Sequence, residues 1–202
     1  MSLKIINRND TFCIILTNIF NSSRSVEFAV VRKFILMSAT LDSILSRRSI
    51  RKYENKEIPQ ETINNILEAG RQAPSAVNKQ PIRFVVVKDG ETSKNFSSAL
   101  FNRFIKDAPM VIVGCADVKS LLTGKWAVVD TTIALQNMVI AAWSLGVGSC
   151  WIGAFNEEKV RQLLKIPEKW KIVALVTFGY PSEQPKARKK KKVEELFGFD
   201  SF

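Results

Sequence analysis

Hydrophobic and polar positions follow a regular order along most of this chain. Apolar residues recur at helical spacing within 38–49 and again after Pro59, a residue that suits the first turn of a helix. Residues 91–106 and 156–165 show the same spacing, and Asn156 is a suitable cap for the last of these segments. The pattern therefore predicts a series of amphipathic helices.

Four segments are rich in β-branched and aromatic residues and predict strands. They span residues 82–87, 110–116, 147–153 and 171–180. Residues 126–145 are apolar nearly all round a helix, which places this helix inside a domain or in a large subunit interface. The sum predicts an α+β fold with one long central helix.

The first 36 residues do not match this pattern. Their apolar stretch, 11–20, is too short to span a bilayer, and Asp10 weakens its likeness to a signal peptide. We expect Met37 to be the natural start. Residues 1–36 would then be an N-terminal extension that is poorly ordered or lies upstream of the natural start, and residues 37–202 would form the folded domain.

The composition is that of one globular domain with an excess of positive charge. The chain has 202 residues, of which 46% are hydrophobic, and 30 Lys and Arg residues against 19 Asp and Glu give a net charge of +11. Such an excess favours an anionic partner: nucleic acid, a membrane surface or a phosphorylated small molecule. Part of the excess is local, because residues 186–192 read KARKKKK.

The sequence contains no histidine, which excludes catalytic triads, general bases and zinc sites that need an imidazole. Its three cysteines, Cys13, Cys115 and Cys150, form no closely spaced pair. The last two lie in apolar, strand-like runs, so buried reduced thiols are expected rather than a nucleophile or a disulfide. We expect a cytoplasmic protein without a metal site.

A dense set of hydrogen-bond donors follows the first predicted helix. It consists of Arg47, Arg48, Ser49 and Arg51. Arginine offers planar, two-pronged donation that suits a phosphate group. The alternative is a solvated basic helix end, where cations favour the helix dipole.

A loop rich in side-chain amides lies between Pro74 and Pro81. It carries Ser75, Asn78 and Gln80, and it is either part of a binding site or an ordinary turn with asparagine in a strained conformation.

Two glycines, Gly148 and Gly153, flank the end of the third predicted strand at Trp151 and Ile152. A glycine backbone there would let a flat ring approach closely, although packing explains the glycines equally well.

Taken together, these segments resemble the nitroreductase family of FMN-dependent oxidoreductases. The resemblance runs from about residue 40 to residue 197 and rests on motifs that occur in order: RRSIRKY, the helix IPQETINNILEAG, APSAVNKQPIRFVVV, DAPMVIVGCAD, LGVGSCWIGAF and GYPSEQPKARKKKKVEELF. It implies a nitroreductase-like fold with a central, mostly antiparallel sheet of four to five strands flanked by helices, and a long buried central helix. It also implies a homodimer with FMN at the interface.

The resemblance also assigns roles within the cofactor site. The matching residues are Arg47, Arg48, Ser49, Arg51, Pro74, Ser75, Asn78, Ile152, Gly153, Lys186 and Arg188. The first three and the two tail cations match phosphate contacts, and Arg51 matches a cation at the pyrimidine edge of the ring. The loop at 74–78 matches the one that the second subunit lays over the flavin. The backbone at 152–153 matches the segment that faces flavin N5 and O4.

The implied activity is transfer of a hydride from NADH or NADPH onto flavin N5, followed by reduction of a nitroaromatic, a quinone or a similar small acceptor. No catalytic side chain is expected, because the flavin is the reactive centre. One alternative is a specialised flavoprotein reaction, such as reductive dehalogenation or flavin breakdown. Another is a basic nucleic-acid-binding protein, which we favour less because no aromatic residue interleaves the run at 186–192. We expect no specific nucleic acid and no membrane among the partners.

Overall fold

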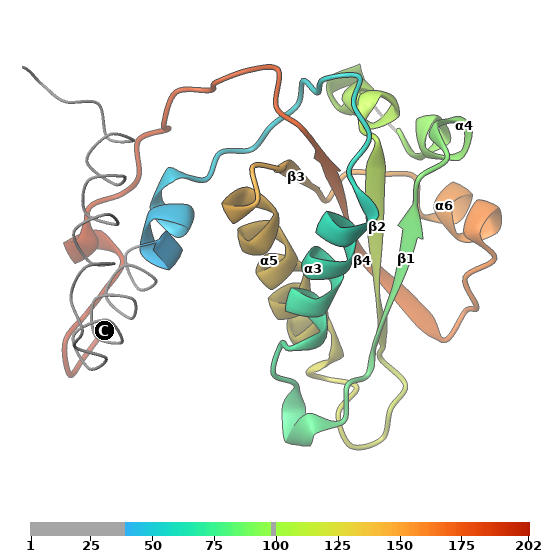
Figure 1. Cartoon of the computed structure of the whole chain (residues 1–202). Coiled ribbons are helices and arrows are strands. Elements are labelled where there is room, and N and C mark those ends of the chain that lie inside the picture. The colour runs from blue at the N-terminus through green and yellow to red at the C-terminus, as the bar shows by residue number, and fades with distance from the viewer. Residues whose placement is uncertain (1–38, 98–99) are drawn as a thin grey trace, which may run out of the picture. The chain divides into compact units, whose positions relative to one another are not determined.

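The computed structural model describes residues 39–97 and 100–202 (Figure 1). The chain divides into two compact units, Met1–Leu45 and Ser46–Phe202. In the first unit the described residues, 39–45, are helical. This helix ends at residue 46, and the spacing within 38–49 predicts a helix here. The predictions for residues 1–36, Met37 and Cys13 lie outside the described residues.

The second unit is built on a four-stranded sheet. Its strands are β1 (Ile82–Val87), β2 (Met110–Asp117), β3 (Gly148–Ile152) and β4 (Trp170–Gly179). They lie in the order β1-β2-β4-β3, and every neighbouring pair is antiparallel. The four predicted strands and the antiparallel sheet are confirmed.

The register of the strands defines two ends of the sheet that matter for the site. At one end Gly148 pairs with Gly179, and we call this the Gly179 end. At the other end Asp117 pairs with Trp170, and we call this the Asp117 end. Because β3 is the shortest strand, its last residue, Ile152, pairs with Leu175 in the middle of β4.

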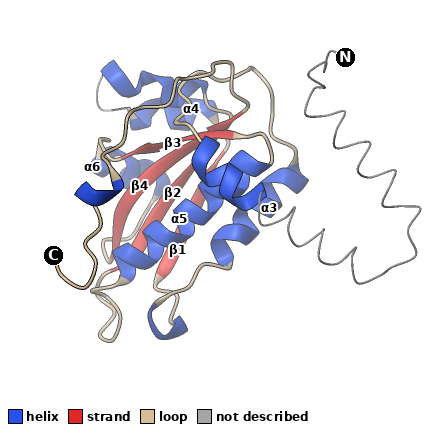
Figure 2. Cartoon of the chain, turned by 90° about the vertical axis from the view of Figure 1, so that its left-hand side faces the viewer, coloured by secondary structure: helices blue, strands red, loops and turns tan. Residues whose placement is uncertain are grey.

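Helices cover both faces of the sheet. Helices α3 (Gln60–Arg71) and α5 (Ala127–Ser144) pack on one face, and Figure 2 shows α5 in front of the strands. The other face is covered by α6 (Glu157–Leu164) and by short helical turns, around a second apolar cluster that includes Phe96 and Val160. The two clusters fix the sheet between layers of apolar side chains.

Helix α5 confirms the predicted long central helix. It buries Leu135, Met138 and Val139 against the sheet and α3. Val129 on α5 and Trp126, the residue just before the helix, remain 45% and 48% exposed. An apolar side chain that stays at the surface of such a helix fits the second sequence-based interpretation, a subunit interface.

None of the helices in residues 39–97 and 100–202 is long and apolar enough to cross a membrane. Within the same part of the chain, no group of acidic or cysteine side chains is arranged to hold a metal ion. The cytoplasmic location stays a prediction.

The prediction of one short helix over 91–106 is wrong. The region forms α4 (Gly90–Ser93) and the 3₁₀ helices η2 (Lys94–Phe96) and η3 (Leu100–Asp107). Asp89 caps α4 by accepting from two backbone N–H groups, and Asn102, with φ −116° and ψ 17°, interrupts η3. The apolar spacing is real, because Phe96 and Ile105 are buried, but the backbone between them is not a continuous α-helix.

Candidate functional site

The first group of predicted site residues lies beside β3. Ser49 forms a parallel bridge with Ser149, and the backbone N–H of Ile50 donates to the Ser149 carbonyl oxygen over 2.9 Å. The Ile50 side chain is buried against Gly148, where a Cβ atom would lie 2.6 Å from the Ile50 Cγ1 atom. The glycine therefore lets this segment lie directly on the strand.

Residues 51–54 and 180–183 pair with each other, and we call them the clamp. Two backbone hydrogen bonds, of 2.9 and 3.0 Å, join the two segments. In addition, the Glu183 Oε1 atom accepts from the backbone N–H groups of Arg51 and Lys52, over 2.6 and 3.2 Å. We call residues 47–51 the arginine segment and residues 186–192 the basic tail. The clamp holds the end of the arginine segment against the chain that leads into the basic tail.

The predicted cations differ in how firmly they are placed. Arg47 and Arg48 are half-buried, and the Arg48 Nη1 atom donates to the carbonyl oxygens of Ser46 and Arg47 over 2.8 and 2.9 Å. Lys186 and Arg188 follow the clamp and are exposed. The structure places the arginine segment beside β3, through the contacts of Ser49 and Ile50 with Ser149. Among the described residues no hydrogen bond joins Lys186 or Arg188 to Arg47, Ser49 or Arg51.

Tyr53 was not predicted as a site residue, although it ties the arginine segment to the sheet. Its hydroxyl donates to the Ile50 carbonyl oxygen and accepts from the Thr177 Oγ1 atom, each over 2.7 Å. Burial raises the pKa of Tyr53, so the hydroxyl keeps its proton. Burial also raises the pKa of Cys150, and the charge of Arg51 opposes that shift. Cys150 is a free, buried thiol, as predicted.

The predicted ring-facing segment ends β3. Ile152 is buried, whereas Gly153 is exposed, and a Cβ atom built on Gly153 would meet nothing within 4 Å. The turn that follows is fixed because the Asn102 Nδ2 atom donates to the Ala154 carbonyl oxygen over 2.5 Å. A flat group can therefore approach the backbone at this position without meeting a side chain.

The amide-rich loop lies at the Asp117 end of the sheet, where the Asp117 N–H donates to the Pro81 carbonyl oxygen over 2.9 Å. Asn78 and Gln80 have φ angles of 57° and 52°, so the strained asparagine expected from the sequence is present. The Ser75 Oγ atom accepts from the Gln80 N–H over 3.0 Å and closes the loop.

An open hollow of about 280 Å³ lies between this loop and the first turns of α5. Its lining residues are Pro74, Ser75, Ala76, Trp126, Asp130 and Ile133. Asp130 is buried, and sequence reasoning missed it as a site residue. The signal was present, because it is the one charged residue of a largely apolar helix.

The predicted site residues thus form two groups within one chain. The arginine segment lies at the Gly179 end of the sheet, and residues 152–153 follow along β3. The loop at 74–78 lies at the opposite end, as Figure 1 shows. The first group is rich in cations and suits a phosphate, whereas the loop offers a hydroxyl and an amide.

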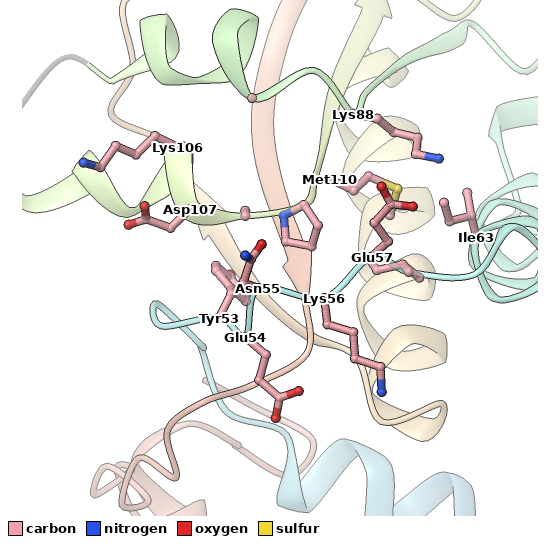
Figure 3. Close-up of a pocket in the computed structure, with 14 residues that line it drawn as sticks. Tyr53, Glu54, Asn55, Lys56, Glu57, Ile63, Lys88, Lys106, Asp107 and Met110 are labelled. Atoms are coloured by element: carbon pink, nitrogen blue, oxygen red, sulfur yellow. The ribbon is translucent and has the colours of Figure 1, made fainter.

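A second hollow, of about 520 Å³, lies at the Gly179 end and is lined by Tyr53 and the residues that follow it (Figure 3). Six of its lining side chains are charged, three of each sign. In Figure 3 the ammonium groups of Lys56, Lys88 and Lys106 point in different directions. The hollow therefore gathers no cluster of one charge, and none of the predicted site residues lines it.

This chain is similar to known proteins over most of its length. The model of the nitroreductase family matches residues 44–108 and 96–180. Two proteins named NADH dehydrogenase/NAD(P)H nitroreductase are similar over 154 residues, or 73% of this chain. The one from Archaeoglobus fulgidus is 40% identical with 88% of its length covered, and the one from Methanothermobacter thermautotrophicus is 39% identical with 80% covered.

The fold is shared with solved structures. An FMN-dependent nitroreductase from Clostridium difficile R20291 has a TM-score of 0.72 and 31% sequence identity. The match covers 80% of this chain and 99% of that one. The names of these relatives agree with the expected flavin and nicotinamide cofactors.

Proposed function

Because the chain belongs to the nitroreductase family, we propose that it is an FMN-dependent oxidoreductase that takes electrons from NADH or NADPH and reduces a nitroaromatic, a quinone or a similar small acceptor. One observation carries the proposal. The arginine segment and the open backbone at Gly153 lie along one strand, where a phosphate and a flat ring can be held side by side.

The residues at the Gly179 end fit the phosphate of FMN. Arg47, Arg48 and Ser49 offer charged and neutral donors from a segment that backbone hydrogen bonds already hold. Because these donors are already ordered, less conformational entropy is lost when they bind an anion. Lys186 and Arg188 start beside the clamp and would close on the phosphate from the tail.

The residues along β3 fit the ring. The missing side chain at Gly153 leaves the backbone open, and the preceding Ile152 is buried in the core. The Arg51 backbone is held by Glu183, and its guanidinium lies 6.0 Å from the centre of the Phe104 ring. A cation at one edge of the flavin ring would stabilise the negative charge that gathers there when the flavin is reduced.

FMN would supply the redox chemistry, and this chain would bind it, orient it and shield it from water. The chain contributes no histidine to acid–base chemistry, in keeping with a mechanism in which the cofactor is the reactive group.

We propose that the active form is a homodimer. The loop at 74–78 cannot reach the arginine segment of its own chain, because the two lie at opposite ends of the sheet. A second copy can supply the loop instead. The apolar side chains near the loop favour such a contact, since Val77, Trp126 and Val129 are 79%, 48% and 45% exposed.

The test starts with the purified chain and FMN. We expect FMN to bind and NADH or NADPH to be oxidised when a quinone or a nitroaromatic is present. Arg47→Ala should weaken FMN binding, whereas the control Arg83→Ala, at an exposed position on β1, should not. A chain that binds no FMN would overturn the proposal.

The dimer is tested separately by dilution. FMN affinity should fall as the chain is diluted below the concentration at which sedimentation shows dissociation. An unchanged FMN affinity in the monomer would leave the enzyme proposal standing and refute the shared site.

A further inference from the structure

The loop at 74–81 has a backbone that must be held in place. Val77, Asn78 and Gln80 have φ angles of 45°, 57° and 52°. The left-handed region is unfavourable for any residue with a side chain, and most of all for a β-branched residue such as Val77. Such conformations persist only where the surrounding structure imposes them, and they cluster at functional sites.

Asp130 contacts the residue that directly precedes the strained part of the loop. Both of its carboxylate oxygens accept from the backbone N–H of Ala76, over 3.2 and 3.3 Å. Ala76 directly precedes the strained residues, and Asp130 comes from the first turn of α5, 54 residues away in sequence. The contact therefore anchors the loop to the central helix.

Asp130 stands out among the acidic residues by its burial. Asp130 is 4% exposed, and it is the only buried acidic side chain among residues 39–97 and 100–202. No ion pair compensates it in that part of the chain. Aspartate is rarely buried without a partner, and the partner here is the backbone N–H of Ala76.

We propose that Asp130 is a positioning residue, which holds Ala76 so that Pro74, Ser75 and Asn78 are presented to the flavin. The inference rests on the proposed function for what the loop contacts. The anchoring itself is independent of the proposed function, because the hydrogen bonds to Ala76 provide it.

Three variants separate anchoring from general stability. Asp130→Ala removes the acceptor, and Asp130→Asn keeps one acceptor oxygen without the charge. Ala76→Pro removes the N–H donor from the other side. Proline is compatible with this position, because Ala76 begins a 3₁₀ turn and Ser75 has the extended conformation, φ −139° and ψ 158°, that residues before proline favour. The matched control is Asp107→Asn at an exposed position.

The first measurement is hydrogen exchange of the loop amides without FMN. Asp130→Ala and Ala76→Pro should speed exchange of the Asn78 and Gln80 amides about tenfold or more, and Asp130→Asn should change it less. Combining Asp130→Ala with Ala76→Pro should add nothing further, because both remove the same contact. Exchange that stays at the wild-type rate in both single variants overturns the anchoring.

The second measurement is FMN affinity, followed by quenching of flavin fluorescence. Asp130→Ala should weaken binding about tenfold or more, with partial rescue in Asp130→Asn. Faster exchange combined with wild-type FMN affinity would refute the positioning role alone. A wild-type chain that binds no FMN would refute the proposed function, while the exchange data still decide whether Asp130 holds the loop.

Discussion

Replacing Tyr53 by phenylalanine should loosen the arginine segment and destabilise the chain. The lost hydroxyl donates to the Ile50 carbonyl oxygen and accepts from Thr177 Oγ1, each over 2.7 Å. Ile50 and Thr177 are 1% and 0% exposed, so water cannot take the place of the missing oxygen. The Ile50 carbonyl oxygen then loses this partner, and Thr177 keeps only a longer bond of 3.3 Å to the Cys150 carbonyl oxygen.

The size of the effect follows from these two hydrogen bonds. Each contributes about 0.5–1.5 kcal/mol net, and an unpaired buried acceptor moves the loss toward the upper part of that range. We expect the free energy of unfolding to fall by about 2 kcal/mol. For a chain of this length that is a drop in the melting temperature of about 4–8 °C. FMN affinity should fall as well, because Ile50 lies within the arginine segment.

The assay is urea unfolding followed by circular dichroism, and the chain offers its own control. It has only two tyrosines, and the other, Tyr180, makes no hydrogen bond through its hydroxyl in the described residues. Its ring lies 4.3 Å from the Lys56 ammonium group. Tyr180→Phe should therefore cost less than about 0.5 kcal/mol. Equal losses in the two variants would refute the role given to the Tyr53 hydroxyl.

Of three other predictions, two concern the same region and one concerns a buried thiol toward the Asp117 end of the sheet. Gly148→Ala should destabilise the chain in urea unfolding, because its Cβ atom would lie 2.6 Å from the Ile50 Cγ1 atom, whereas Gly153→Ala should leave unfolding unchanged and weaken only FMN binding in a fluorescence titration. Glu183→Ala should weaken FMN binding more than Glu183→Gln, which keeps an acceptor for the clamp. Burial raises the pKa of Cys115 to about 11, so the unfolded thiol ionises first as the pH rises above about 9. The free energy of unfolding should fall over that interval, and Cys115→Ala should reduce the fall in urea titrations at pH 8 to 11.

The sequence predicts the strands well because their signal is local. Runs of β-branched and aromatic residues mark all four. Gly146, with φ 76°, follows the C-cap of α5, a position where glycine commonly ends a helix. The region at 91–106 shows the limit of the same reasoning. Apolar spacing indicates which side chains are buried. It does not indicate that Asn102 donates to the Ala154 carbonyl oxygen, 52 residues away.

The candidate site divides in the same way. The arginine segment is visible because its donors are adjacent in sequence. The roles of Tyr53 and Asp130 cannot be predicted from the sequence, because their partners lie 124 and 54 residues away. Only the folded chain shows that a hydroxyl within RRSIRKY contacts the last strand, or that the single carboxylate near the start of α5 reaches the loop after α3.

These distant contacts connect the fold to the proposed chemistry. The central helix α5 packs on the sheet, holds the loop at Ala76 through Asp130, and leaves Trp126 and Val129 at the surface beside that loop. A second copy that covers these two apolar side chains would also receive the loop. Dimer formation and completion of the flavin site would then be one event. Ligand binding would stabilise the dimer by the same free energy by which the dimer favours the ligand, because linked equilibria are reciprocal.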